Sequence, residues 1–102
     1  MNYGLTQKQL NLIIQVFQST PAVEKAYIYG SRVKNTHKKT SDIDLAVVLQ
    51  SNTKNVLGKL KSALEDLPII YEIDLSDEAN MHTGNFKDEY EKTKLLIYES
   101  TK

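Results

Sequence analysis

Residues 26–49 read AYIYGSRVKNTHKKTSDIDLAVVL and contain the pattern that decides the fold. The β-prone residues 26–29 stop at a glycine, which predicts a first strand. The polar and basic residues 30–41 predict a loop with room for one helical turn. Residues 42–49 are nearly all apolar after Asp44, which predicts a second strand covered on both faces.

The flanking segments supply the rest of the predicted architecture. Thr6 and Gln9 match a capping box, and apolar residues at helical spacing behind them predict a helix over residues 7–19, ended by Pro21. We further expect a helix over residues 54–66, a strand over 69–75, a helix over 86–93, and residues 95–98 either as its last turn or as a short strand. The fold class is therefore α/β or α+β, a small sandwich of sheet and helices.

Length and composition limit the architecture further. The chain has 102 residues, of which 40% are hydrophobic and 25% are charged, so we expect one domain spanning residues 1–102. A chain of this size leaves no room for separate catalytic and substrate domains. The absence of cysteine excludes disulfides and thiol nucleophiles. Without a long apolar run or a signal-peptide pattern, we expect a soluble cytoplasmic protein that does not enter a membrane.

The charges cancel overall but are unevenly distributed along the chain. Nine of the 13 basic residues lie in residues 1–64, and ten of the 13 acidic residues lie in residues 65–102. A compact basic cluster lies in the loop after the first predicted strand: Arg32, Lys34, His37, Lys38 and Lys39. Such a cluster can attract a phosphate-rich ligand, although charge alone is equally consistent with a solvated loop.

The main chemical signal is the pair of aspartates in Ser41-Asp42-Ile43-Asp44. Side chains two residues apart on a strand point to the same face, so Asp42 and Asp44 project together. Two carboxylates this close repel each other unless a cation lies between them, and Mg²⁺ suits one or two carboxylates together with phosphate oxygens. Alone, such a pair is more often a solvated strand entry than a metal site.

A third carboxylate on the next strand strengthens the case for metal binding. Asp74 lies near the end of the predicted strand over residues 69–75 and approaches Asp42 and Asp44 if the two strands are neighbours. Three carboxylates on adjacent strands can hold two metal ions that stabilise the attacking and leaving oxygens of a phosphoryl-group displacement. Asp77, in the following loop, is a rival for the third position.

Gly30 and Ser31 follow the first predicted strand directly. A glycine lets the backbone approach a ligand closely, and a serine hydroxyl with nearby N–H groups can hold phosphate oxygens. Arg32 adds positive charge beside them. A Gly-Ser pair alone is equally consistent with an ordinary turn, so its specificity comes from the whole arrangement of strand, turn, basic loop and acidic strand entry.

Gly30-Ser31-Arg32 together with Ser41-Asp42-Ile43-Asp44-Leu45 resembles the signature of the nucleotidyltransferase superfamily related to DNA polymerase beta. The short chain and its leading helix look like the minimal nucleotidyltransferase (MNT) domains of that superfamily. The resemblance implies a polymerase beta-like palm fold, with a small mixed β-sheet flanked by helices. It also implies transfer of a nucleoside monophosphate, AMP from ATP, to an acceptor hydroxyl, with pyrophosphate leaving.

The resemblance assigns roles to individual residues. Asp42, Asp44 and Asp74 would be the catalytic carboxylates and would hold two Mg²⁺ ions, with Asp74 helping to deprotonate the acceptor. Gly30 and Ser31 would hold the triphosphate, and the charge of Arg32 would help to neutralise the leaving pyrophosphate.

The resemblance also implies a partner. Minimal members are often paired with a HEPN-domain ribonuclease toxin, so the chain would be an antitoxin that attaches AMP to a tyrosine of that protein. Two alternatives remain open: a catalytically weak or inactive binding module that neutralises the HEPN partner by docking, and a transferase that acts on a small molecule or a nucleic-acid end. We do not expect nucleic acid as a direct ligand of the favoured enzyme, and the sequence leaves a homo-oligomer open.

Overall fold

The computed structural model describes residues 4–33, 42–50, 55–81 and 85–100. The elements in chain order are α1 (Gln7–Gln18), β1 (Val23–Tyr29), the 3₁₀ turn η1 (Gly30–Arg32), β2 (Ile43–Leu49), α2 (Val56–Glu65), β3 (Ile73–Asp77), the 3₁₀ turn η2 (Glu78–Asn80), α3 (Asn85–Thr93) and β4 (Leu95–Glu99).

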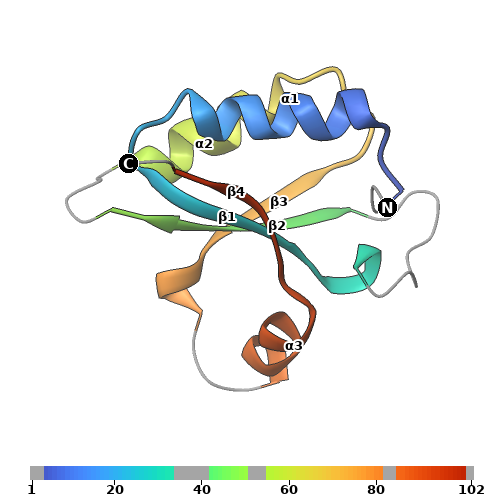
Figure 1. Ribbon diagram of the computed structural model, residues 1–102, viewed down its shortest axis with the longest axis vertical. Helices are drawn as coiled ribbons and strands as arrows, with labels where there is room; N and C mark the ends of the chain where they lie inside the picture. The colour runs from blue at the N-terminus through green and yellow to red at the C-terminus, as the bar shows by residue number, and fades with distance from the viewer. Residues whose placement is uncertain (1–3, 34–41, 51–54, 82–84, 101–102) are drawn as a thin grey trace.

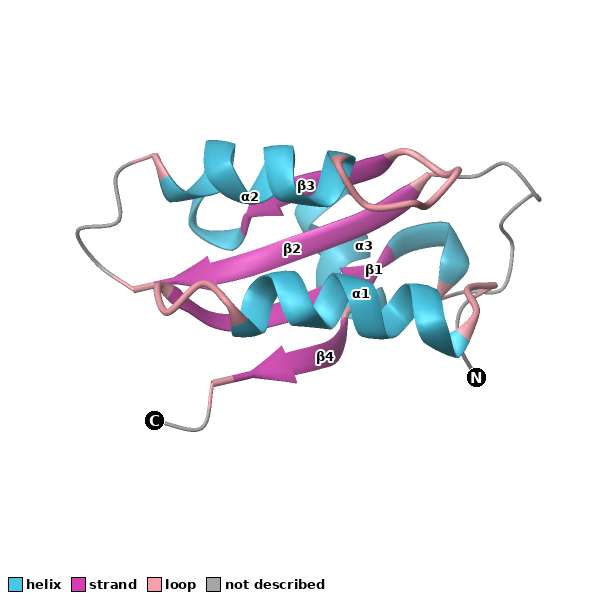
Figure 2. Ribbon diagram, turned by 90° about the horizontal axis from the view of Figure 1, so that it is seen from above, coloured by secondary structure: helices cyan, strands magenta, loops and turns pink. Residues whose placement is uncertain are grey.

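The strands form one mixed sheet in the order β3-β2-β1-β4. The inner strand β1 pairs antiparallel with both β2 and β4, whereas the inner strand β2 runs parallel to β3. Helices α1 and α2 lie on one face of the sheet, and α3 lies on the other (Figure 1). Seen from above, α1 and α2 run side by side over the strands (Figure 2). The predicted fold class, a mixed sheet flanked by helices, is confirmed.

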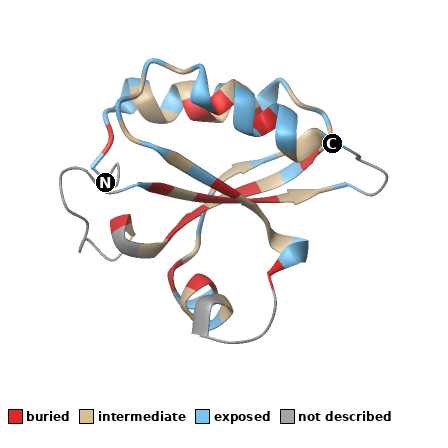
Figure 3. Cartoon of the chain, turned by 180° about the vertical axis from the view of Figure 1, so that it is seen from behind, coloured by how far each residue is buried: buried red, intermediate tan, exposed pale blue. Residues whose placement is uncertain are grey.

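The alternation of side chains along β2 divides the interior into two clusters. Ile43, Leu45 and Val47 are fully buried beneath α1 and α2, whereas Ala46 faces α3. Figure 3 shows the buried residues concentrated along the strands and on the helix faces turned toward the sheet. The larger cluster contains Leu5, Ile13, Phe17, Val23, Ala26, Ile28, Ile43, Leu45, Val47, Leu60, Leu64 and Leu75, and the smaller contains Tyr29, Ala46, Met81 and Tyr90.

The local signals at the first helix act as predicted. The Thr6 hydroxyl accepts a hydrogen bond from the Gln9 N–H at 3.0 Å, and the Gln9 side chain accepts one from the Thr6 N–H at 2.9 Å. This capping box satisfies two N–H groups at the start of α1 that have no partner within the helix. Ile13 and Phe17 are buried against the sheet, as their spacing predicted.

The third strand differs from its prediction over residues 69–75, because β3 begins only at Ile73. After α2 the chain must return to the sheet, and it bends there, with the Ile69 N–H donating to the Leu67 carbonyl at 2.7 Å. Ile70 is 89% exposed in this bend. The first bond to β2 forms only when the Ile43 N–H meets the Glu72 carbonyl at 2.8 Å.

Two other boundaries also differ from or complete the predictions. Strand β1 begins at Val23 rather than at residue 26, because Val23 pairs with Leu49 at the far end of β2. Residues 95–98, for which two structures were open, belong to the strand β4 and pair with β1.

Part of the predicted basic cluster lies outside the described residues: Lys34, His37, Lys38 and Lys39. Within the segments that the structure describes, no helix combines the length and apolar character needed to cross a membrane.

Two leucines offer a matched test of this core. Leu45 in β2 is fully buried, whereas Leu96 in the edge strand β4 is 48% exposed. We expect Leu45→Ala to lower the free energy of unfolding by about 2–5 kcal/mol because it leaves a cavity. Leu96→Ala should cost less than about 1 kcal/mol. Urea denaturation of both variants checks this, and equal losses would contradict the described packing.

Candidate functional site

The register of three strands places Tyr29, Asp44 and Asp74 in one row across the sheet. Tyr29 of β1 is the partner of Asp44 in β2, and Asp44 is the partner of Asp74 in β3. Partners in neighbouring strands point to the same face, and those strands lie about 4.8 Å apart. Asp42 precedes Ile43 by one residue and shares the alternation of Asp44. The row lies on the α3 side of the sheet, opposite α1 and α2.

The three carboxylates Asp42, Asp44 and Asp74 differ in their exposure. Asp42 and Asp74 are exposed, whereas Asp44 is half-buried. Burial, followed by the nearby charges of Asp74 and Asp42, raises the pKa of Asp44 to about 6, while the charge of Arg32 acts in the opposite direction. Asp44 is therefore the carboxylate at which desolvation and like charge act together.

Gly30 provides the space that the Asp44 carboxylate occupies. Its φ of +83° lies in the left-handed region, which side-chain-bearing residues rarely adopt. A Cβ atom at this position would lie 2.7 Å from Oδ2 of Asp44. The Gly30 N–H donates to Oγ1 of Thr93 at 3.0 Å, so this amide already has a partner within the protein. The backbone of Ser31 continues the same 3₁₀ turn.

Arg32 is a buried residue at the end of η1. Its side chain is 2% exposed, and its Nε donates to the Asp42 carbonyl oxygen at 3.3 Å. Its guanidinium carbon lies 4.4 Å from the centroid of the Tyr71 ring, a cation–π contact. Arg32 thus ties the turn after β1 to the start of β2. Its burial and its contact with Tyr71 were not predicted from the sequence.

Tyr29 is a further polar residue of the site that the sequence reasoning missed. It is 4% exposed, and burial raises the pKa of its hydroxyl, opposed by a hydrogen bond with the Ser76 side chain and supported by the charges of Asp44 and Asp74. The phenol is therefore a neutral hydroxyl beside the carboxylates at ordinary pH. Only its pairing with Asp44 marks it, and the local sequence does not reveal that pairing.

Two residues were candidates for the third carboxylate, and Asp74 lies in the row with Asp44, whereas Asp77 does not. Asp77 pairs with Val47 and lies an odd number of residues from Asp74, so it faces the other side of the sheet. Its Oδ1 accepts from the Ala79 N–H at 3.0 Å and caps the turn η2.

The donor set suits a magnesium ion that also binds phosphate. Among the residues whose placement is described, no three or more His, Cys, Asp or Glu side chains converge closely enough to hold a metal ion by themselves. Mg²⁺ is commonly bound through one or two carboxylates, with water and substrate phosphates as its remaining ligands. A cation beside Asp44 would stabilise its ionised form against the burial and the like charges that raise the pKa of this carboxyl, so Asp44 with Asp42 or Asp74 fits such an ion.

The sequence model of the family described as polymerase beta, nucleotidyltransferase, matches residues 11–102. The chain belongs to this family. It is 26% identical over 99 residues to the "Probable protein adenylyltransferase MntA" of Haemophilus influenzae. The alignment covers 96% of this chain and 86% of that protein. This match and the family agree with the resemblance of the Gly30 and Asp42 motifs.

Solved structures share the nucleotidyltransferase fold of this chain. One is a crystal structure of a toxin-antitoxin with AMP-PNP, with a TM-score of 0.64 and 24% identity, covering 90% of this chain and 74% of that chain. Another is the tri-AMPylated Shewanella oneidensis HEPN toxin in complex with MNT antitoxin, with a TM-score of 0.61 and 22% identity. The match covers 94% of this chain and 74% of that chain. At these identities the likeness concerns the fold.

Two glycines test the role of Gly30 in shaping the site. Gly30→Ala should lower the free energy of unfolding by about 1–3 kcal/mol, because alanine is strained at this φ and its Cβ meets Asp44. The control Gly58→Ala lies in α2 with no atom within 4 Å of the added Cβ. It should stabilise the protein by about 0.5–1 kcal/mol. Thermal denaturation compares the two, and stabilisation by both would contradict this account of Gly30.

Proposed function

We propose that this family member transfers AMP from ATP to a tyrosine hydroxyl of a HEPN-domain protein, in a reaction that depends on Mg²⁺, and that it acts as an antitoxin. The observation that supports this best is the row in which Asp44 and Asp74 lie on paired positions of neighbouring strands, beside the turn at Gly30. This arrangement favours an enzyme of phosphoryl-group displacement over a module that only docks on a partner. The reason is that it holds partly desolvated negative charge that a metal–nucleotide complex would neutralise.

In this proposal the three aspartates supply the metal ligands and the base. Asp42 and Asp44 would hold the magnesium ions, and Asp74 would hold the catalytic ion and take the proton of the acceptor hydroxyl. The acceptor oxygen then bonds to the α-phosphorus of ATP, and the bond from that phosphorus to the bridging oxygen breaks, so pyrophosphate leaves. Bound magnesium supplies charge neutralisation of the attacking and leaving oxygens.

The turn η1 completes the proposed nucleotide site. Gly30 and Ser31 hold the triphosphate. Gly30 contributes its backbone shape and the space that the Asp44 carboxylate occupies, because its own N–H is bonded to Thr93. Arg32 is buried against the Asp42 backbone and the Tyr71 ring, and its charge stabilises the ionised form of Asp44.

The donor, acceptor and partner are proposed from the relatives. The similar Haemophilus influenzae protein is named a protein adenylyltransferase, one similar structure holds AMP-PNP, and another pairs an MNT antitoxin with an AMPylated HEPN toxin. In this proposal the HEPN partner presents its own tyrosine hydroxyl to the site.

Transfer of label from ATP tests the proposal. The chain is incubated with Mg²⁺, ATP labelled at the α-phosphate and a HEPN-domain partner, and label on a partner tyrosine is measured. Asp44→Asn should lower the rate roughly a hundredfold or more, because charge stabilisation worth several kcal/mol is lost. The matched control Asp66→Asn changes an exposed carboxylate at the end of α2, on the other side of the sheet, and should leave transfer intact.

The same experiment separates catalysis from docking alone. Neutralisation of the partner by Asp44→Asn at wild-type strength, without transfer, would show that binding alone suffices. Label that persists in Asp44→Asn would rule out the proposed mechanism.

A further inference from the structure

Thr93 forms a bond that links the end of α3 to the turn of the proposed nucleotide site. It is the last residue of α3, and it is 6% exposed. Its Oγ1 lies 3.0 Å from the Gly30 nitrogen and 2.8 Å from the Glu89 carbonyl oxygen. The bond to Gly30 joins residues that are 63 positions apart in the sequence.

The polarity of the two bonds is determined by the chemistry of the groups. A threonine hydroxyl has a single proton and two lone pairs. Because the Glu89 carbonyl can only accept, the proton goes to Glu89. The lone pairs are left for the Gly30 N–H, which can only donate. The hydroxyl is therefore held as an acceptor directed at the turn.

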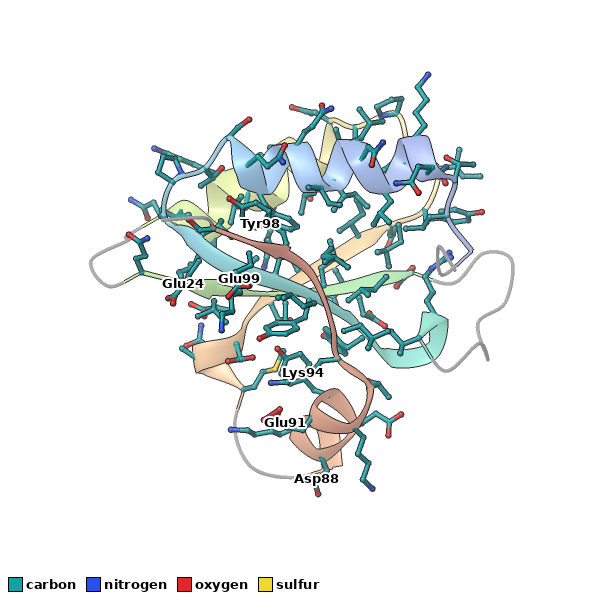
Figure 4. The ribbon with its side chains drawn as sticks, viewed as in Figure 1. Glu24, Asp88, Glu91, Lys94, Tyr98 and Glu99 are labelled. Atoms are coloured by element: carbon teal, nitrogen blue, oxygen red, sulfur yellow. The ribbon has the colours of Figure 1, made fainter. Side chains whose placement is uncertain are left out.

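The position of Thr93 is itself held from both sides. On the helix side, the Lys94 N–H donates to the Tyr90 carbonyl at 2.8 Å, and the Tyr90 ring packs edge-on against Tyr29 at 5.0 Å between centroids. On the sheet side, Leu95 pairs with Ile28, two residues before Gly30. Figure 4 shows Lys94 at this junction of α3 and β4, near Glu91, to which its Nζ is bonded at 2.8 Å.

The bond constrains the turn at its first peptide. Fixing the Gly30 N–H fixes the plane of the Tyr29–Gly30 peptide, and φ of Gly30 is the rotation about the next bond. The unusual φ of +83° therefore starts from a fixed plane, and the direction in which the turn continues through Ser31 follows from it. Without the hydroxyl, a partly buried N–H would lose its partner, which favours reorientation of the turn.

We propose that Thr93 is a positioning residue for nucleotide binding: its hydroxyl holds the turn at Gly30 and Ser31 in the orientation that receives the phosphates of ATP. Thr93 does not touch the nucleotide and acts through Gly30. This inference rests on the proposed function, because it takes ATP as the ligand of the turn.

The test uses variants that remove or keep the acceptor. Thr93→Val keeps the shape and removes the hydroxyl, Thr93→Ala removes it without adding a methyl group beside the N–H, and Thr93→Ser restores it. The matched control is Thr20→Val. The Thr20 hydroxyl also donates to a helix carbonyl four residues earlier, that of Val16 at 3.0 Å, but it lies after α1 on the other side of the sheet.

Two measurements distinguish positioning from a general loss of stability. The dissociation constant of Mg²⁺·ATP is measured by calorimetry, and hydrogen exchange of the Gly30 amide by NMR. Thr93→Val and Thr93→Ala should weaken binding roughly tenfold and speed the exchange by a similar factor, as expected for a lost hydrogen bond whose donor is partly buried. Thr93→Ser should remain within about twofold of the wild type. Thr20→Val should change neither quantity, even where it lowers the melting temperature.

The outcomes separate this inference from the proposed function. Unchanged affinity in Thr93→Val and Thr93→Ala, or loss of affinity that Thr93→Ser does not restore, would overturn the role of Thr93. A wild-type chain that binds Mg²⁺·ATP but transfers no AMP would overturn the proposed function, while the affinities still decide the role of Thr93. A wild-type chain that binds no Mg²⁺·ATP would overturn both.

Discussion

The site depends on one electrostatic constraint, the placement of a half-buried carboxylate beside another carboxylate. The parallel pairing of β2 and β3 puts Asp44 next to Asp74, and burial with like charge raises the pKa of Asp44 to about 6. In the protein without a bound cation, this arrangement lowers the free energy of unfolding. The arrangement becomes favourable when positive charge is brought to it, which is what a magnesium-bound triphosphate does.

The surroundings of Asp44 are adapted to this constraint. Gly30 lacks the Cβ that would collide with Oδ2 of Asp44, and Arg32 holds the start of β2 while its charge partly offsets the repulsion. Tyr29 contributes a neutral hydroxyl bonded to Ser76 rather than another charge. Negative charge is therefore concentrated in the row of carboxylates, and the neighbouring groups shape and support it.

The two faces of the sheet divide the work between stability and chemistry. Ile43 and Leu45 point to the face beneath α1 and α2, where the larger apolar cluster buries them completely. Asp44, between them in sequence, points to the other face, where the smaller cluster around Tyr90 leaves room for polar groups. The rigid apolar face fixes the backbone of β2, so the carboxylate on the opposite face is held at a defined position. Strand β2 thus joins the core to the site.

Local patterns predicted much of this structure, and long-range pairing decided the rest. The capping box at Thr6 and the shared face of Asp42 and Asp44 follow from spacings of two or three residues, so the sequence reveals them. Asp44 and Asp74 lie on paired positions because β2 and β3 are neighbours in the sheet. The sequence predicts their approach only on the condition that these two strands are neighbours. The late start of β3 and the bond from Gly30 to Thr93 arise where distant segments meet, and no local pattern encodes them.

The site rests on Asp44 being a carboxylate whose ionised form is destabilised by burial and like charge and is stabilised by a divalent cation. Its most direct test is the pKa of the Asp44 side chain, followed by carboxyl ¹³C NMR from about pH 3 to about pH 8, with and without Mg²⁺. The account predicts a midpoint at about 6 without metal, and a lower midpoint when Mg²⁺ is present. A midpoint at the ordinary value of 3.8 that does not respond to Mg²⁺ would contradict it.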